Sequence, residues 1–263
     1  NNTAVGYQAL STEDGHGNST AIGYRALKTQ NAGAEAYNVA VGVDAGLDIT
    51  TGVRNTLLGT FAGSNLTSGA YNVAIGYNSL GTENAHGFNT AVGYQTLKFL
   101  DAGADAYNVA MGYQAGLSVT TGIQNTLIGG LAGDALTVGG SNVAIGKSAL
   151  STDTHGSYSV AIGQNALTNQ VLGSATDVYN TAVGRAAGRN TTVGTQNTFI
   201  GGLAGNDQTT GVRSVFVGYK AGNAVTTGDS NVAIGWQALM TEDAHSNNVA
   251  VGASALQTQN AGA

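Results

Sequence analysis

The residues best suited to chemistry lie in a short acidic loop that also carries a histidine. Its first copy contains Glu13, Asp14 and His16. Related copies follow at Glu83, Asn84 and His86, at Asp153 and His155, and at Glu242, Asp243 and His245. Carboxylate and imidazole groups together are ligands for divalent transition metals. Two carboxylates about 5 to 9 Å apart also suffice to hydrolyse a glycosidic bond.

The repetition of this loop argues against both kinds of site, because an active site is normally unique. Successive copies start 70 or more residues apart, which separates them by about 19 Å or more in a stack of strands. One chain therefore does not bring two of its histidines together. We interpret the loops as solvated, and predict no metal, no cofactor, no catalytic residue and no enzymatic activity. The histidines that remain candidate metal ligands are His16, His86, His155 and His245.

Aromatic residues recur at two fixed places and are the second group that suggests binding. One set follows a repeated glycine: Tyr7, Tyr24, Tyr77, Tyr94, Tyr113, Tyr219 and Trp236. The other precedes a repeated asparagine: Tyr37, Tyr71, Tyr107, Tyr158 and Tyr179. Such amphipathic rings on a fibre surface bind glycans or partner proteins. The alternative is that they stack on their neighbours and seal the corners of the fold.

The element that positions all these residues is a five-residue motif, first seen as Asn2 to Gly6 (Asn-Thr-Ala-Val-Gly). It occurs fifteen times, and eleven of the fourteen spacings between its glycines are 17 residues. A fixed short period indicates a solenoid or fibre in which each repeat is one rung. The sequence therefore predicts an all-β fold, a parallel β-roll or β-solenoid of about fifteen 17-residue rungs.

Each motif is predicted to form a strand, because Thr, Val and Ile suit a pleated backbone. Side chains alternate along a strand, so Thr3 and Val5 share one face, which we expect to be the core. Asn2, Ala4 and Gly6 share the other, a flat face that a second sheet or chain can approach. Stacking predicts a hydrogen-bonded column of asparagines. Its members are Asn2, Asn38, Asn55, Asn72, Asn89, Asn108, Asn125, Asn142, Asn180, Asn197, Asn231 and Asn248.

The rungs also follow a longer pattern, a four-rung super-repeat of about 70 residues. Two rungs carry Leu four residues after the motif glycine, and the next two carry Gly there. We expect a second strand or a corner after the motif glycine, and then a polar loop. In Gly-type rungs a glycine stands ten residues after the motif glycine, where we expect positive φ. Longer rungs enlarge this loop near residues 30–36, 100–106 and 170–178, which indicates an outer surface.

Composition narrows the class of protein. The 263 residues include 41 Gly, no Pro and no Cys, and only 9% are charged, against about 25% in an ordinary domain. The net charge of −6 argues against nucleic acid, which needs a basic patch, and no apolar run is long enough for a membrane span. We interpret residues 1–263 as a single continuous repeat array and as an excerpt of a longer chain.

The motif resembles a known family. Residues 72–76 (Asn-Val-Ala-Ile-Gly), 159–163 (Ser-Val-Ala-Ile-Gly) and 231–235 (Asn-Val-Ala-Ile-Gly) resemble the head repeats of YadA-like trimeric autotransporter adhesins. They also resemble repeats in some phage tail fibres. The resemblance covers essentially the whole chain. It implies a left-handed parallel β-roll, three chains wound about one axis, and a role in attachment.

These observations predict a non-enzymatic fibre segment, from a phage tail fibre or a cell-surface adhesin, whose loops face a receptor or glycan. The expected partner is the chain itself as a homotrimer, because a bare apolar face is rare on soluble monomers. The expected location is extracellular, on a cell surface or on a virion. One alternative is a structural filament or sheath without a receptor. Another is an ice-binding solenoid, which needs an exposed Thr array.

Overall fold

A computed structural model of the chain describes residues 1–14, 17–241 and 243–258. It divides into two compact units, Asn1–Gly130 and Leu131–Ala263. Each unit is a parallel β-solenoid in which every turn contributes one short strand, and the described residues contain no helix. The predicted β-solenoid is thereby confirmed.

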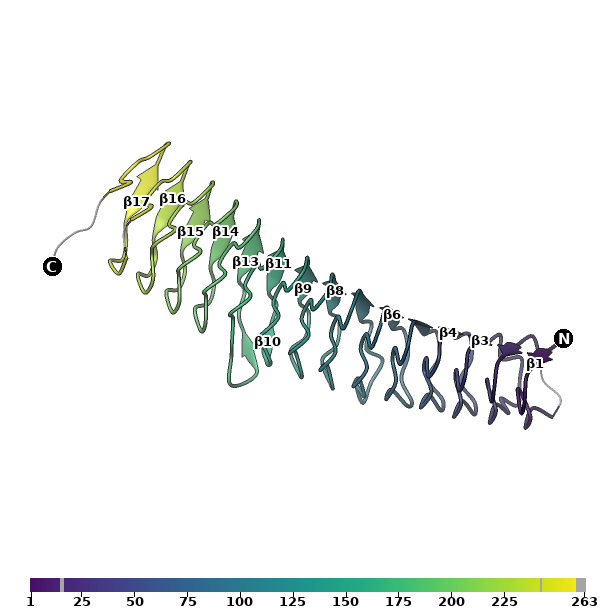
Figure 1. Ribbon diagram of the computed structural model, residues 1–263. Helices are drawn as coiled ribbons and strands as arrows, with labels where there is room; N and C mark the ends of the chain where they lie inside the picture. The colour runs from purple at the N-terminus through teal and green to yellow at the C-terminus, as the bar shows by residue number, and fades with distance from the viewer. Residues whose placement is uncertain (15–16, 242, 259–263) are drawn as a thin grey trace. The chain divides into compact units, whose positions relative to one another are not determined.

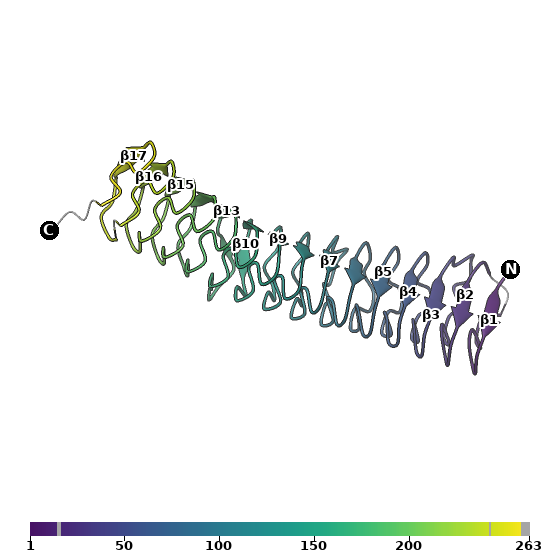
Figure 2. The ribbon, with the colours of Figure 1, turned by 45° about the horizontal axis from the view of Figure 1, so that its top comes forward.

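In the first unit eight strands stack in the order in which they occur in the chain (Figure 1). Their bounds are β1 Thr3–Val5, β2 Thr20–Ile22, β3 Val39–Val41, β4 Thr56–Leu58, β5 Val73–Ile75, β6 Thr90–Val92, β7 Val109–Met111 and β8 Thr126–Ile128. All pairs are parallel and keep one register, so that Thr3 lies beside Thr20 and Ala4 beside Ala21. Figure 2 shows these strands as a regular series along one side of the coil. The motif is thus the strand.

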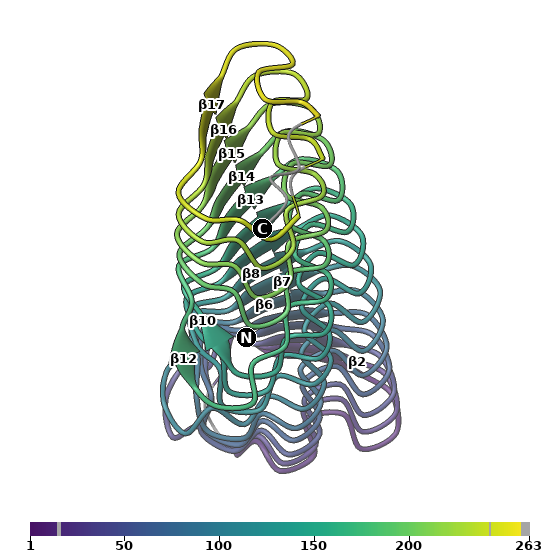
Figure 3. The same ribbon diagram turned by 90° about the vertical axis from the view of Figure 1, so that its left-hand side faces the viewer.

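The second unit repeats this arrangement and adds a small side sheet. Its main strands are β9 Val143–Ile145, β11 Val160–Ile162, β13 Thr181–Val183, β14 Thr198–Ile200, β15 Val215–Val217, β16 Val232–Ile234 and β17 Val249–Val251. The side sheet pairs β10 Gly156–Ser157 with β12 Thr176–Asp177. The strand β12 lies in the long loop 170–178, and Figure 3 shows this pair apart from the main strands. The extra residues of this rung are therefore added away from the main strands.

The face of each strand that points inward is opposite to our expectation. The central Ala21, Ala74 and Ala144 have no exposed surface, and the motif asparagines are buried beside them. By contrast, Val41 and Ile234 are 36% and 39% exposed. The predicted core of Thr, Val and Ile is therefore wrong, whereas the predicted alternation of the two faces is correct.

The reason for this inversion is the small volume inside one turn. In Leu-type rungs the corner leucine fills the interior, as Leu27 does with no exposed surface, and the strand centre is Ala. In Gly-type rungs the strand centre can be larger. A Cβ on Gly63 would lie 2.8 Å from Leu57 Cδ2, and one on Gly205 would lie 2.5 Å from Phe199 Cδ1. Leu corners thus occur with Ala strand centres, whereas Gly corners leave room for larger side chains such as Leu57 and Phe199.

A corner, not a second strand, follows the motif glycine in every turn. The second and fourth residues after it have positive φ even where they are not glycine, as in Gln95 (φ 53°) and Leu97 (φ 48°). The glycine ten residues after the motif glycine does not have positive φ, so our expectation of positive φ at that position is wrong. At Gly69 the requirement is space, because a Cβ there would lie 2.6 Å from the His86 carbonyl oxygen.

Candidate functional surface

Within each unit the asparagine column lies inside the solenoid and joins successive turns. Asn55 illustrates the pattern: its backbone N–H donates to Asn38 Oδ1 at 2.8 Å, and its own Oδ1 accepts the Asn72 N–H at 2.9 Å. Its Nδ2 donates to the Gly69 carbonyl oxygen at 2.9 Å. Asn55 therefore bonds to the turns on both sides and closes the loop of its own turn, and Asn38 and Asn197 donate to their own loops in the same way. Most of these contacts are between side chain and backbone, whereas an amide ladder of the cross-β type joins side chains.

Members of the column at 0% exposure are Asn38, Asn55, Asn72, Asn89, Asn108, Asn125, Asn142, Asn180, Asn197 and Asn231. Asn2 is exposed and Asn248 is half-buried. Where serine takes the place of asparagine, its hydroxyl accepts the same bond, as from the Asn231 N–H to Ser214 Oγ at 3.3 Å. The ten buried members are structural and are inaccessible to a ligand.

The outward side chains of the strands form what we call the outer stripe, the Thr or Val and the Val, Ile, Leu or Met of each motif. Exposed members are Val5, Ile22, Val39, Val41, Val109, Met111, Ile200, Ile234, Val249 and Val251. Met111 and Ile200 are 46% and 42% exposed. Within each unit the constant register places these apolar groups in two columns. The outer stripe thus presents a repeated apolar surface, interspersed with Thr, to solvent.

The aromatic residues that follow the motif glycines lie beside this stripe in sequence and stack on one another. Tyr77, Tyr94 and Tyr113 form a run with ring centroids 5.5 Å apart and nearly parallel planes, and Tyr7 stacks on Tyr24 at the same distance. These rings, Tyr219 and Trp236 are 44 to 65% exposed. Stacking and exposure coexist, so one edge of the column remains open to a partner.

The aromatic residues that precede the motif asparagines form a second column. Phe88 lies between Tyr71 and Tyr107 with centroids 5.0 and 4.9 Å away. Arg54 occupies the same position one turn earlier, with its guanidinium 5.4 Å from the centroid of Tyr71 and 5.9 Å from that of Tyr37. A cation over a ring face is attractive, so the arginine continues the column.

Carboxylates modify the edge of this second column. The Tyr37 hydroxyl donates to the Glu35 carboxylate, and this bond raises the pKa of Tyr37 above its ordinary value. The Tyr179 hydroxyl donates to Asp177 Oδ2 at 3.2 Å, which likewise raises the pKa of Tyr179. Both hydroxyls therefore stay protonated near neutral pH. Their acidic neighbours favour neutral or cationic groups over anionic ones.

A bidentate ion pair joins two turns elsewhere in the first unit. Arg25 Nε lies 2.8 Å from Asp44 Oδ1, and its terminal nitrogen lies 2.6 Å from Asp44 Oδ2. The hydrogen bonds to Asp44 raise the pKa of Arg25. In the second unit, burial raises the pKa of Asp134. Among the described residues, none of these ionisable groups lies in an arrangement suited to catalysis.

The acidic loops with histidine differ from one another more than their sequences indicate. His16 and Glu242 lie outside the described residues. His155 Nδ1 contacts Thr154 Oγ1 at 2.7 Å, and the carbonyl oxygen of His245 accepts a bond from Asn231 Nδ2. His86 Nδ1 lies 3.2 Å from Glu83 Oε1. The structure brings only Glu83, His86 and Asp101 into a cluster able to hold a metal ion, among the residues it describes.

Sequence reasoning missed a carboxylate that recurs in this loop, seven residues after the first motif glycine of each four-rung super-repeat, or block. It is buried at Glu83 and Asp153 and half-buried at Glu13. In the first and third blocks a glutamine from the next turn covers it: Gln30 Nε2 donates to Glu13 at 2.9 Å, and Gln170 Nε2 donates to Asp153 at 2.5 Å. The regular spacing of this carboxylate can be read from the sequence. Its inward direction cannot be read there, because the residue lies in a loop.

Comparison of the chain with family models, with curated proteins and with solved structures finds no match. In the described part of the chain, no helix has the length and apolar character needed to cross a membrane.

Proposed function

We propose that this chain is a non-enzymatic segment of an extracellular fibre, of the kind found in phage tail fibres or cell-surface adhesins, and that it associates as a homotrimer. The observation that supports this is the outer stripe. Val, Ile, Leu or Met side chains repeat on the outward side of the strands, with Met111 and Ile200 near half exposed. Soluble monomers rarely leave a long continuous apolar surface uncovered.

A symmetric assembly of identical chains is the simplest cover for such a surface. Within each unit the turns present outward residues of the same kind in one register, so a second and a third copy find matching rows along that unit. The surface that we expected to mediate association, the Ala and Gly face, is interior. The outer stripe takes its place in the proposal. The loops and the aromatic columns then remain available to a glycan or receptor.

The oligomeric state tests this proposal. We expect native mass spectrometry of the purified chain to give three copies. The double variant Met111→Lys, Ile200→Lys should dissociate into monomers while keeping its β circular dichroism, because buried lysines are costly only in the assembly. Val193→Lys is the matched control, since Val193 is 51% exposed but lies in a loop, and it should remain trimeric. A wild-type monomer contradicts the trimer.

An ice-binding solenoid is the second candidate, and the inverted faces favour it more than the sequence did. The Thr column that we assigned to the core, including Thr56, Thr90 and Thr126, points outward. A regular exposed Thr and Val array is the feature that this activity requires. The expected result for this candidate is thermal hysteresis of a monomeric wild-type chain, abolished by Thr56→Lys, Thr90→Lys. A trimer without thermal hysteresis excludes ice binding and supports the fibre.

A structural filament or sheath is the remaining alternative. A chain that forms end-to-end polymers and binds no receptor would favour it.

A further inference from the structure

We infer that Glu83, His86 and Asp101 form a binding site for a divalent transition metal such as Zn²⁺, which would join two neighbouring turns of the first unit. One ligand atom from each of the three residues lies within 4.8 Å of the others. Glu83 and His86 belong to the turn of β5, and Asp101 belongs to the turn of β6. This inference is independent of the proposed fibre function.

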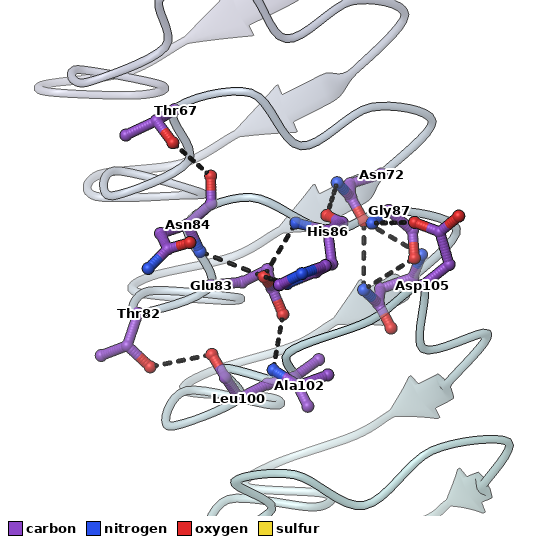
Figure 4. A network of polar contacts seen from close by, with 11 residues as sticks. Thr67, Asn72, Thr82, Glu83, Asn84, His86, Gly87, Leu100, Ala102 and Asp105 are labelled. Carbon is purple, nitrogen blue, oxygen red and sulfur yellow. Dashed lines mark hydrogen bonds and ion pairs between the residues drawn. The ribbon is translucent and has the colours of Figure 1, made fainter.

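The anionic anchor of the site is a fully buried carboxylate, that of Glu83. Backbone N–H groups hold it in place: Asn84 and His86 donate to Oε1 at 3.1 Å, and Ala102 donates to Oε2 at 3.3 Å (Figure 4). A buried charge is costly unless it is paired or binds a metal. The N–H groups fix the direction of the oxygens, as outer hydrogen bonds do at metal sites.

The geometry of the first two ligands already suits a tetrahedral ion. Metal bonds of about 2.0 to 2.2 Å place neighbouring ligand atoms about 3.3 to 3.5 Å apart. The distance between His86 Nδ1 and Glu83 Oε1 is 3.2 Å. Asp101 is exposed, so its carboxylate is free to rotate toward the ion. The imidazole and the small ligand number favour Zn²⁺ over Ca²⁺, which takes six to eight oxygens.

Comparison with the other blocks shows that this arrangement is a departure from the repeat. In the first and third blocks Gln30 and Gln170 donate an amide to the buried carboxylate. In the second block Leu100 stands at the glutamine position and offers no donor. Glu83 therefore lacks the glutamine amide that covers Glu13 and Asp153.

Next to this position the second block has one additional candidate ligand. Asp101 replaces Asn31 and Val171 of the other blocks. His155 of the third block contacts Thr154 instead of the carboxylate. The carboxylate position occurs four times in the sequence. Among the copies that the structure describes, only that of the second block lies in a metal-binding set, which points to a specific role for that copy.

Zinc titration of the metal-free 263-residue chain, without a histidine tag, tests the inference by isothermal calorimetry. We expect one Zn²⁺ per chain and a rise in the unfolding midpoint on binding. Asp101→Asn should weaken binding by at least about tenfold, and it restores the residue type of Asn31. His86→Gln should have a similar effect. Because Asp101 is exposed, its variant is expected to fold normally.

His155→Gln is the matched control, because His155 lies in the related loop of the third block and should not affect the affinity. Co²⁺ in place of Zn²⁺ should give the visible absorption of a tetrahedral ion, and Asp101→Asn should remove it. Two results overturn the inference. One is no saturable Zn²⁺ binding by the wild type. The other is equal affinity of the wild type and Asp101→Asn, which would mean that the ion binds elsewhere.

Discussion

Replacing Gly201 by alanine should unfold the second unit at a much lower denaturant concentration than the wild type, with a loss of about 3 kcal/mol or more in the free energy of unfolding. Gly201 ends β14 with φ +132°, a conformation that side chains rarely adopt. The added Cβ would also lie 2.5 Å from the carbonyl oxygen of Gly218 on the next turn. That neighbour is backbone, so the two turns would have to separate.

The adjacent residue supplies the control for this prediction. Gly202 has no positive φ, and a Cβ on it would meet Tyr219 Cδ2 at 3.5 Å, an ordinary contact. Gly202→Ala should therefore stay within about 0.5 kcal/mol of the wild type, or stabilise it slightly. Urea unfolding followed by circular dichroism measures both variants. Equal urea unfolding midpoints for Gly201→Ala and Gly202→Ala would contradict the prediction, because they would show that neighbouring turns separate at little cost in free energy.

Replacing Asn55 by alanine is the second substitution with a large expected effect, about 3 to 5 kcal/mol of unfolding free energy. The side chain accepts from the Asn72 N–H and donates to the Gly69 carbonyl oxygen, both in the interior. Alanine leaves both groups without a partner, and each buried unpaired group costs about 1 to 3 kcal/mol. The small cavity adds to the loss.

Asn55→Ser should cost about half as much, because serine keeps an acceptor. The chain already uses it so at Ser19, where Oγ accepts the Asn38 N–H at 3.2 Å, and at Ser214. Asn65→Ala is the control on an exposed asparagine in the same turn and should change stability by less than about 0.5 kcal/mol. If alanine and serine at position 55 have equal effects, the acceptor is not what holds the column together.

The period of the motif was enough to predict the strand, its parallel register and the solenoid. It was not enough to decide which face is inside. Val41 and Ala40 point to opposite faces whichever face is buried. The usual preference of branched side chains for a core favours burial of Val41, which is wrong. What decides the question is the volume inside one turn. Leu27, Leu57 and Phe199 fill it, and this leaves room for Ala and Asn on most strands.

Two further features were hidden because they depend on backbone conformation at ordinary residues. Leu97 and Tyr107 have positive φ, although neither residue type signals it. The inward direction of Glu83 follows from the path of the loop, which the sequence pattern does not specify. The repeated acidic loop was recognised, but its four copies looked equivalent. Only the three-dimensional surroundings show that Leu100 and Asp101 set one copy apart.

The asparagine column has a direction, and this has a consequence for synthesis. In the first unit the backbone N–H of a motif asparagine donates to the side-chain oxygen of its counterpart in the turn before, as from Asn55 to Asn38 and from Asn72 to Asn55. A finished turn thus presents a ready acceptor to the segment that the ribosome makes next. N-terminal segments emerge first, and repeat arrays grow from a formed neighbour. We therefore expect each turn to serve as a template for its successor as the chain is synthesised.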